Sequence, residues 1–101
     1  MKAILWGTGA ARDISTIVAE IALENPAAAK LFLRAVRLKV DRLSQFPLIG
    51  AMQAGRPSSL HVRRLVHGSY LIYYTVHRTE IRIRAVVHGA RLFQRAWLHR
   101  P

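Results

Sequence analysis

The sequence predicts an α+β domain in which an N-terminal strand and an antiparallel helical hairpin pack on a small, mainly antiparallel β-sheet, in the order β-α-α-β-β-β. Apolar residues recur at helical spacing through residues 8–45, whereas residues 60–87 alternate with a period of two. The dipeptide Asn25-Pro26 divides the helical part, and so short a break between two amphipathic helices favours an antiparallel hairpin. A hairpin that covers one face of a sheet buries the apolar side of both layers.

Residues 2–6 predict a short strand that ends at Gly7-Thr8-Gly9. Thr8 is a suitable N-cap for a helix that runs to about residue 23, because its hydroxyl can accept an orphan N–H of the first turn. The apolar stripe of this helix consists of Ile14, Ile17, Val18 and Ile21. Its solvent face consists of Arg12, Asp13 and Glu20.

The second helix is predicted to begin at Pro26, with Asn25 as its N-cap, and to run to about residue 45. Its apolar seam consists of Phe32, Val36, Val40 and Leu43. Its other face, expected to be solvated, carries Lys30, Arg34, Arg37 and Lys39. Residues 47–59 contain two prolines and two glycines, which predicts a connecting loop.

Three strands follow this loop, over residues 60–66, 70–76 and 81–87. Adjacent arginines disturb the alternation of the first, which predicts an edge or bulged strand. The second strand places Tyr70, Ile72, Tyr74 and Val76 on one face, where packing in the core is the default for the two tyrosines. The third strand is expected to place Ile81, Ile83, Ala85 and Val87 on one face and Arg82 and Arg84 on the other.

The 101 residues form a single predicted domain, 1–101, and are 51% hydrophobic, which is enough for one modest core. The chain has no cysteine, which excludes disulfides and thiolate metal sites and is consistent with a reducing cytoplasm. No signal-peptide pattern appears, and the apolar residues 3–6 are too few to span a bilayer. We expect a cytoplasmic protein without metal, cofactor, small-molecule substrate or membrane partner, because no phosphate-binding, dinucleotide or metal-ligand motif occurs.

The charge is strongly and unevenly positive. Sixteen Lys and Arg against five Asp and Glu give a net charge of +11, and thirteen of the sixteen are arginine. Residues 1–49 carry +3 and residues 50–101 carry +8. Such a field favours acidic partners: nucleic acid, a nucleoprotein assembly or an acidic protein.

Several separated blocks resemble the RelE/ParE toxin superfamily of type II toxin–antitoxin modules, often called plasmid stabilisation proteins. Trp6 with Asp13, Ile14 and Ile17 is similar to the family's opening, and Asn25-Pro26-Ala27-Ala28-Ala29 is similar to the hinge between its helices. Later blocks are Leu43–Gly50 (L-S-Q-F-P-L-I-G), Arg63-Arg64-Leu65, Tyr70–Tyr74 (Y-L-I-Y-Y) and Val87-His88-Gly89-Ala90-Arg91. The helix lengths and the H-G-A-R ending resemble the ParE branch more than the RelE branch.

The resemblance implies two targets. ParE-type toxins poison DNA gyrase by trapping it on cleaved DNA, whereas RelE-type toxins cut messenger RNA on the ribosome. Both are neutralised by an antitoxin that wraps a segment over the toxin. We therefore expect a gyrase inhibitor with a cognate antitoxin; the alternatives are a ribosome-dependent endoribonuclease and a non-toxic remnant that binds only antitoxin or DNA.

If the chain were a nuclease, Arg64, His88 and Arg91 would be its catalytic candidates, because RNA cleavage needs proton transfer and stabilisation of phosphate charge. Val66 stands where the nucleases carry a further arginine. Gyrase poisoning requires no acid or base from the toxin, so a structural role for His88, ordering the chain after the last strand, is favoured over a catalytic one.

The residues predicted to contact the target or the antitoxin are Arg63, Arg64, Arg82, Arg84, Arg91 and Trp97. The arginines would form a cationic surface. Trp97 belongs to an apolar C-terminal segment that either packs on the sheet or docks a partner.

Overall fold

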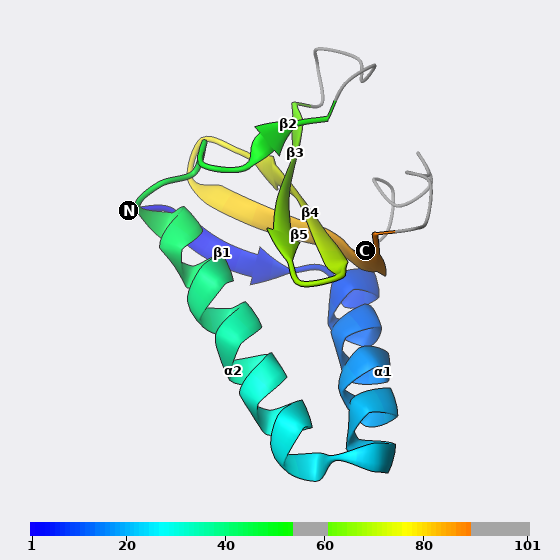
Figure 1. The fold of residues 1–101 in the computed structure, drawn as a ribbon. Helices are drawn as coiled ribbons and strands as arrows, with labels where there is room; N and C mark the ends of the chain where they lie inside the picture. Colours follow the sequence, from blue (N-terminus) through cyan, green and yellow to red (C-terminus); the bar gives the residue numbers. More distant parts are fainter. Residues whose placement is uncertain (54–60, 90–101) are drawn as a thin grey trace.

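The computed structural model describes residues 1–53 and 61–89. The strand β1 (Ala3–Trp6) is followed by the helices α1 (Thr8–Glu24) and α2 (Pro26–Asp41) and by a short 3₁₀ turn, η1 (Arg42–Ser44). The remaining strands are β2 (Ala51–Met52), β3 (Val62–His67), β4 (Tyr70–Val76) and β5 (Glu80–His88). Figure 1 shows the helical hairpin beside the sheet, with the α1–α2 connection at the end remote from it.

The five strands form one sheet in the order β1-β5-β4-β3-β2. β1 lies parallel to β5, and the other three pairings are antiparallel. The predicted α+β fold, with an N-terminal strand and a helical hairpin on a mainly antiparallel sheet, is confirmed. The parallel pairing brings β1 beside β5, so that α1 starts next to the second half of β5.

The two predicted helix starts have different outcomes. Asn25 caps α2 as predicted: its Oδ1 accepts a hydrogen bond from the Ala28 N–H at 3.0 Å, and Pro26 occupies the first turn. The prediction for Thr8 is wrong, because Gly7 is the N-cap of α1, without a side-chain hydrogen bond, and Thr8 is already helical.

The segment after α2 is more structured than predicted. α2 ends at Asp41, earlier than the predicted residue 45, and the chain tightens into η1. The expected loop contains the two-residue strand β2, which pairs with Arg63 and Arg64 of β3. Since β3 lies between β2 and β4 and pairs with β4 without interruption, its first half is not a sheet edge and it carries no bulge.

The main core lies between the helical hairpin and one face of the sheet. Its buried residues are Ala10, Ile14, Ile17, Val36, Val40, Leu43, Ile72, Tyr74, Ile81, Ile83 and Val86. Trp6 and Tyr70 pack against it half-buried. Tyr74 is fully buried, and its hydroxyl donates to the Pro47 carbonyl and accepts from the Gly50 N–H, both at 2.9 Å.

The irregularity of the sheet lies in β5. Tyr73 pairs with Ala85 and Tyr74 with Ile83, so Arg84 is an extra residue in a β-bulge. The bulge reverses the alternation, and Val86 therefore faces the helices together with Ile81 and Ile83. Ala85 and Val87 belong instead to a second buried cluster, on the opposite face, with Val62, Tyr73 and Leu71. The prediction that residues 81, 83, 85 and 87 share one face was wrong for its second half.

Candidate functional site

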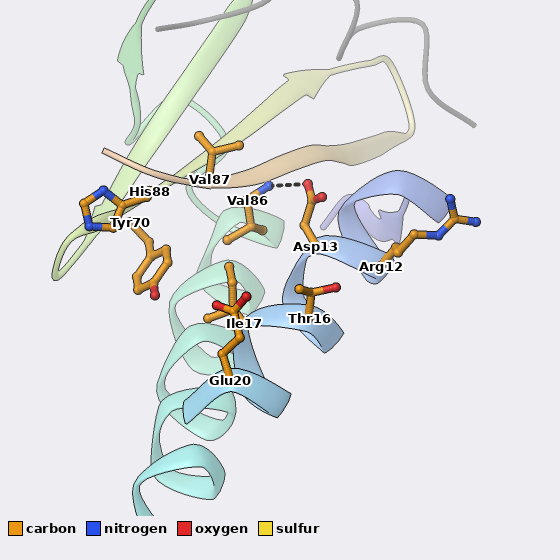
Figure 2. Close-up of a pocket in the computed structure, with 9 residues that line it drawn as sticks. All are labelled: Arg12, Asp13, Thr16, Ile17, Glu20, Tyr70, Val86, Val87 and His88. Carbon is orange, nitrogen blue, oxygen red and sulfur yellow. Dashed lines mark hydrogen bonds between the residues drawn. The ribbon is translucent and has the colours of Figure 1, made fainter. Parts of the chain in front are cut away.

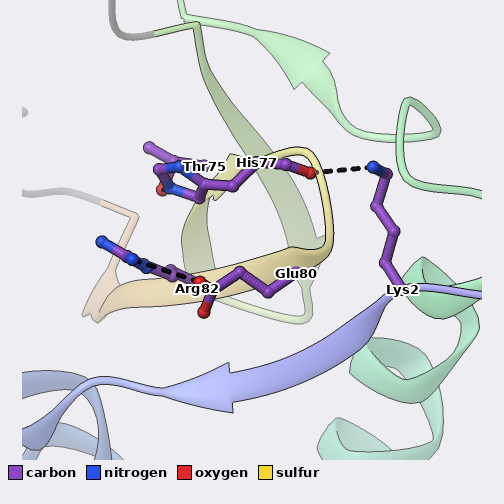
Figure 3. Close-up of polar contacts among 5 residues, drawn as sticks. All are labelled: Lys2, Thr75, His77, Glu80 and Arg82. Carbon is purple, nitrogen blue, oxygen red and sulfur yellow. Dashed lines mark hydrogen bonds and ion pairs between the residues drawn. The ribbon is translucent and has the colours of Figure 1, made fainter.

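Arg82 lies on the sheet face that points away from the helices, and it is paired with Glu80 on the same strand. The distance from Arg82 Nη2 to Glu80 Oε1 is 3.1 Å, and the two side chains are 46% and 20% exposed (Figure 3). This hydrogen bond lowers the pKa of Glu80 and raises that of Arg82. Arg82 is exposed, whereas Glu80 is half-buried, and within the described residues its Oε2 is buried without a hydrogen-bond partner.

Arg84 shares this face with Arg82 and is less exposed. A hollow of about 440 Å³ opens beside them and is lined by Leu5, Trp6, Gly7, Thr8, Glu80, Arg82 and Arg84. Burial, and then the positive charge of Arg82, lowers the pKa of Arg84. Within the described part of the chain, Arg84 Nε is buried without a hydrogen-bond partner. Arg84 Nε is therefore a buried donor that the described part of the fold leaves unpaired.

The turn before β5 is held to the N-terminus. Lys2 Nζ donates to the His77 carbonyl at 2.8 Å (Figure 3). It also donates to the Arg78 carbonyl at 2.6 Å. The His77 ring lies 2.8 Å from the Thr75 hydroxyl. Burial, followed by the charge of Arg82, lowers the pKa of His77. The Arg82 face is thus bordered by a histidine that favours its neutral form.

Arg63 and Arg64 point to opposite faces of β3. Arg63 Nη1 donates to the carbonyls of Gly50, at 2.7 Å, and Leu48, at 3.2 Å, and so holds the segment before β2 in place. Arg64 lies opposite Tyr73, which belongs to the second buried cluster on the face away from the helices. Its Nη1 donates to Gln53 Oε1 at 2.9 Å. Since β4 separates β3 from β5, the backbones of Arg64 and Arg84 are roughly 10 Å apart on one face.

His88 lies on the other side of the sheet, against α1. Its ring meets that of Tyr70 edge to face, with the centroids 5.6 Å apart (Figure 2). A hollow of about 340 Å³ beside it is lined by Arg12, Asp13, Thr16, Ile17, Glu20, Tyr70, Val86, Val87 and His88. The structure thus brings Arg82 and Arg84 together with Arg64 on one face and leaves His88 on the opposite one. Arg91 and Trp97 lie outside the described residues.

Asp13 was predicted to face solvent, and this is wrong. It is half-buried, and its Oδ2 accepts a hydrogen bond from the Val86 N–H at 3.0 Å (Figure 2). Asp13 and Glu20 line one hollow with His88. The only signal in the sequence was the i, i+7 spacing of the two acids on one helix face.

Residues 1–53 and 61–89 contain neither a membrane-spanning helix nor a metal-binding cluster. Over these ranges, no helix combines the length and apolar character needed to cross a bilayer. The same ranges contain no group of three or more His, Asp or Glu side chains placed to bind a metal ion.

The comparisons with known proteins decide the family. The family model described as the ParE toxin of the type II toxin–antitoxin system parDE matches residues 4–93. The chain belongs to the ParE toxin family. The resemblance identified from the separated sequence blocks is therefore confirmed.

Among solved structures, a chain of the chromosomal ParDE toxin–antitoxin system from P. aeruginosa has a TM-score of 0.72 and 22% sequence identity. The match covers 87% of the present chain and 96% of that chain, and it shows a shared fold. No curated protein matches the sequence significantly. In this ParE-family chain, the face with Arg64, Arg82 and Arg84 lies opposite the helical hairpin.

Proposed function

We propose that this ParE-family toxin acts in the cytoplasm by binding DNA gyrase directly, and that a cognate antitoxin neutralises it. The observation that carries the proposal is the cationic face formed by Arg64, Arg82 and Arg84, here called the arginine face. Glu80 lies on the same face but is engaged by Arg82. A surface that presents paired guanidinium groups favours phosphates and carboxylates, which gyrase with its bound DNA supplies.

Inhibition by binding accounts for the site better than cleavage of RNA does. A nuclease would need a proton-transferring group and a cation beside the same phosphate. The sheet separates His88 from Arg64, and the His88 ring packs on Tyr70. The alternative, a ribosome-dependent endoribonuclease, would therefore have to use a different set of residues from the proposed Arg64 and His88.

The direct experiment is a gyrase supercoiling assay with purified toxin, followed by detergent trapping of cleaved plasmid. We expect supercoiling to fall and linear DNA to accumulate with toxin, and both effects to disappear when antitoxin is added. Normal supercoiling at excess toxin would contradict the proposal. Primer extension on translated messenger RNA would then test the ribosomal alternative.

A further inference from the structure

A cationic hollow opens between β5 and the turn that joins β1 to α1. It has a volume of about 440 Å³, and two arginines of β5, Arg82 and Arg84, line it together with Gly7 and Thr8 of the turn. The Gly7 N–H donates to the Ile83 carbonyl at 3.0 Å, which fixes the turn against β5. We call the space between these two walls the turn hollow.

Arg84 lies on the wall of the turn hollow without an acid of its own. It is the extra residue of the β-bulge, and bulges often redirect a side chain beside a site. Arg84 is half-buried, and among residues 1–53 and 61–89 its side chain makes no hydrogen bond or ion pair. The acid that lines the hollow, Glu80, is already paired with Arg82 (Figure 3). An anion beside Arg84 would offset both its burial and its repulsion by Arg82, the two effects that lower its pKa.

The start of α1 adds donors to the opposite wall. Its N-cap is Gly7, which has no side chain, and its first turn contains no acidic residue. The backbone N–H groups and the dipole of this 17-residue helix favour negative charge at its beginning. Thr8, which is exposed, offers a hydroxyl on the same wall. The helix end thus adds to the attraction that the two arginines exert on an anion.

Donors on two walls suit a phosphate better than a carboxylate. One guanidinium fork satisfies both oxygens of a carboxylate, whereas the oxygens of a tetrahedral phosphate can face different walls. Arg64 lies on the same sheet face, two strands away, with its backbone roughly 10 Å from that of Arg84. A ligand with phosphates repeated along its chain can reach both arginines, and the charge of +8 on residues 50–101 attracts it.

We infer that the turn hollow binds a phosphate group of DNA, with Arg84 and the first turn of α1 as its two contacts and Arg82 beside them. The inference rests on the proposed function for the source of that DNA, which is the duplex held by gyrase. It gives the toxin a direct contact with nucleic acid in addition to its contact with the enzyme. Because phosphate contacts carry no sequence information, this binding should be independent of sequence and should weaken steeply with salt.

The test measures binding of the full toxin chain to a short fluorescein-labelled DNA duplex by fluorescence anisotropy, at several salt concentrations. Arg84→Gln should weaken binding about 10-fold and reduce the slope of log K against log salt by about 1, because one phosphate contact is lost. Arg37→Gln removes the same charge at an exposed position of α2 and should stay within about 2-fold of wild type. Circular dichroism of each variant checks that the fold persists.

A second pair of variants separates loss of binding from loss of folding. Thr8→Glu places a carboxylate at the start of α1, where it interacts favourably with the helix dipole and competes with the phosphate. It should weaken DNA binding about 10-fold while the thermal stability is unchanged or raised. Ser15→Glu adds the same charge at an exposed position in the middle of α1 and should stay within about 2-fold.

Inorganic phosphate and polyglutamate are the competing probes. Inorganic phosphate that binds as tightly as the duplex would overturn DNA as the source of the phosphate. Polyglutamate that binds with the same dependence on Arg84 and Thr8 would make the turn hollow a carboxylate site and overturn the inference.

The supercoiling assay separates the inference from the proposed function. If Arg84→Gln and Thr8→Glu bind DNA as wild type does, the inference is overturned, and a wild-type chain that still inhibits supercoiling keeps the proposed function. If both variants lose DNA binding while the wild-type chain leaves supercoiling unchanged, the phosphate contact is supported and the proposed function fails.

Discussion

Asp13 Oδ2 accepts a hydrogen bond from the backbone N–H of Val86 at 3.0 Å, which joins α1 to β5 across 73 residues of sequence. β1 pairs with β5 only as far as Ile83, and among residues 1–53 and 61–89 no strand lies beside this edge of β5 beyond that point. The Asp13 carboxylate accepts the hydrogen bond that the Val86 N–H would otherwise donate to a neighbouring strand. It satisfies a part-buried backbone donor and fixes α1 against the sheet.

Asp13→Ala should therefore destabilise the fold by about 1–3 kcal/mol, because it leaves the Val86 N–H without its acceptor. Asp13→Asn keeps an oxygen acceptor and should cost less. Urea unfolding followed by circular dichroism measures both. Glu20→Ala, at an exposed position two turns along α1, is the control and should change stability by no more than about 0.5 kcal/mol. Equal losses for Asp13→Ala and Glu20→Ala would contradict the role of this hydrogen bond.

Tyr74 provides a second test of a buried polar contact. Tyr74→Phe should destabilise the protein by about 1–3 kcal/mol, since it leaves both the Gly50 N–H and the Pro47 carbonyl without a partner. Tyr70→Phe is the matched control, because no hydrogen bond of the Tyr70 hydroxyl is found within the described part of the chain. Thermal unfolding should separate the two variants by several degrees. A loss for Tyr70→Phe as large as that for Tyr74→Phe would count against the assignment.

Gly50 itself is predicted to resist substitution. A Cβ at this position would lie 2.5 Å from the Tyr74 hydroxyl oxygen and 2.7 Å from the Arg64 carbonyl oxygen. Because the second neighbour is backbone, Gly50→Ala should cost about 1–3 kcal/mol of overpacking strain in urea unfolding. Ala51→Gly, next to it on an exposed site, should cost about 1 kcal/mol or less. An unchanged stability for Gly50→Ala would show that the β2 segment can move away from Tyr74.

The elements that could be predicted are those determined by neighbouring residues. Asn25-Pro26 specifies a helix start by itself, because the amide side chain and the fixed proline φ act within one turn. Alternation likewise placed Arg82 and Arg84 on one face, since both precede the point at which the bulge reverses the alternation of β5. The bulge at Arg84 could not be predicted from alternation, because it depends on how β5 pairs with Tyr73 and Tyr74 of another strand.

In the candidate site too, features set by neighbouring residues could be predicted, whereas features set by the pairing of distant strands could not. Arg64, Arg82 and Arg84 were each identified from local pattern and charge. Arg63 was predicted together with Arg64, but the register of β3 with β4 separates the two and turns Arg63 toward the Gly50 carbonyl. The approach of Asp13 to β5 depends on the parallel pairing of β1 with β5, a contact between segments far apart in the sequence that no local pattern encodes.

Two histidines predict how stability depends on pH. Burial, and then the charge of Lys39, lowers the pKa of His67, and burial followed by Arg82 lowers that of His77. Between the folded pKa and the ordinary value of 6.5, the unfolded chain binds more protons than the folded one, so stability rises with pH. Stability should therefore fall as pH drops below about 6.5, whereas the lowered pKa of Glu80 acts only below its ordinary value of 4.5.

The corresponding measurement is urea unfolding from pH 7.5 to pH 5. His67→Gln/His77→Gln should give a flatter profile than wild type, because the variant has no imidazoles to protonate on unfolding at these positions. An identical slope in the two proteins would assign the pH dependence to other groups.

Charge reversal on the arginine face tests the proposed target contact. Arg82→Glu/Arg84→Glu changes the net charge by −4 and should weaken gyrase inhibition by about 10-fold or more, because the face would then repel acidic groups. Arg12→Glu/Arg37→Glu changes the charge equally at two exposed helical positions and is the matched control. If both pairs weaken inhibition alike, net charge steers the toxin and the arginine face has no special role. If only the first does, and its binding to antitoxin stays at the wild-type level, the arginine face contacts the target and is not needed for neutralisation.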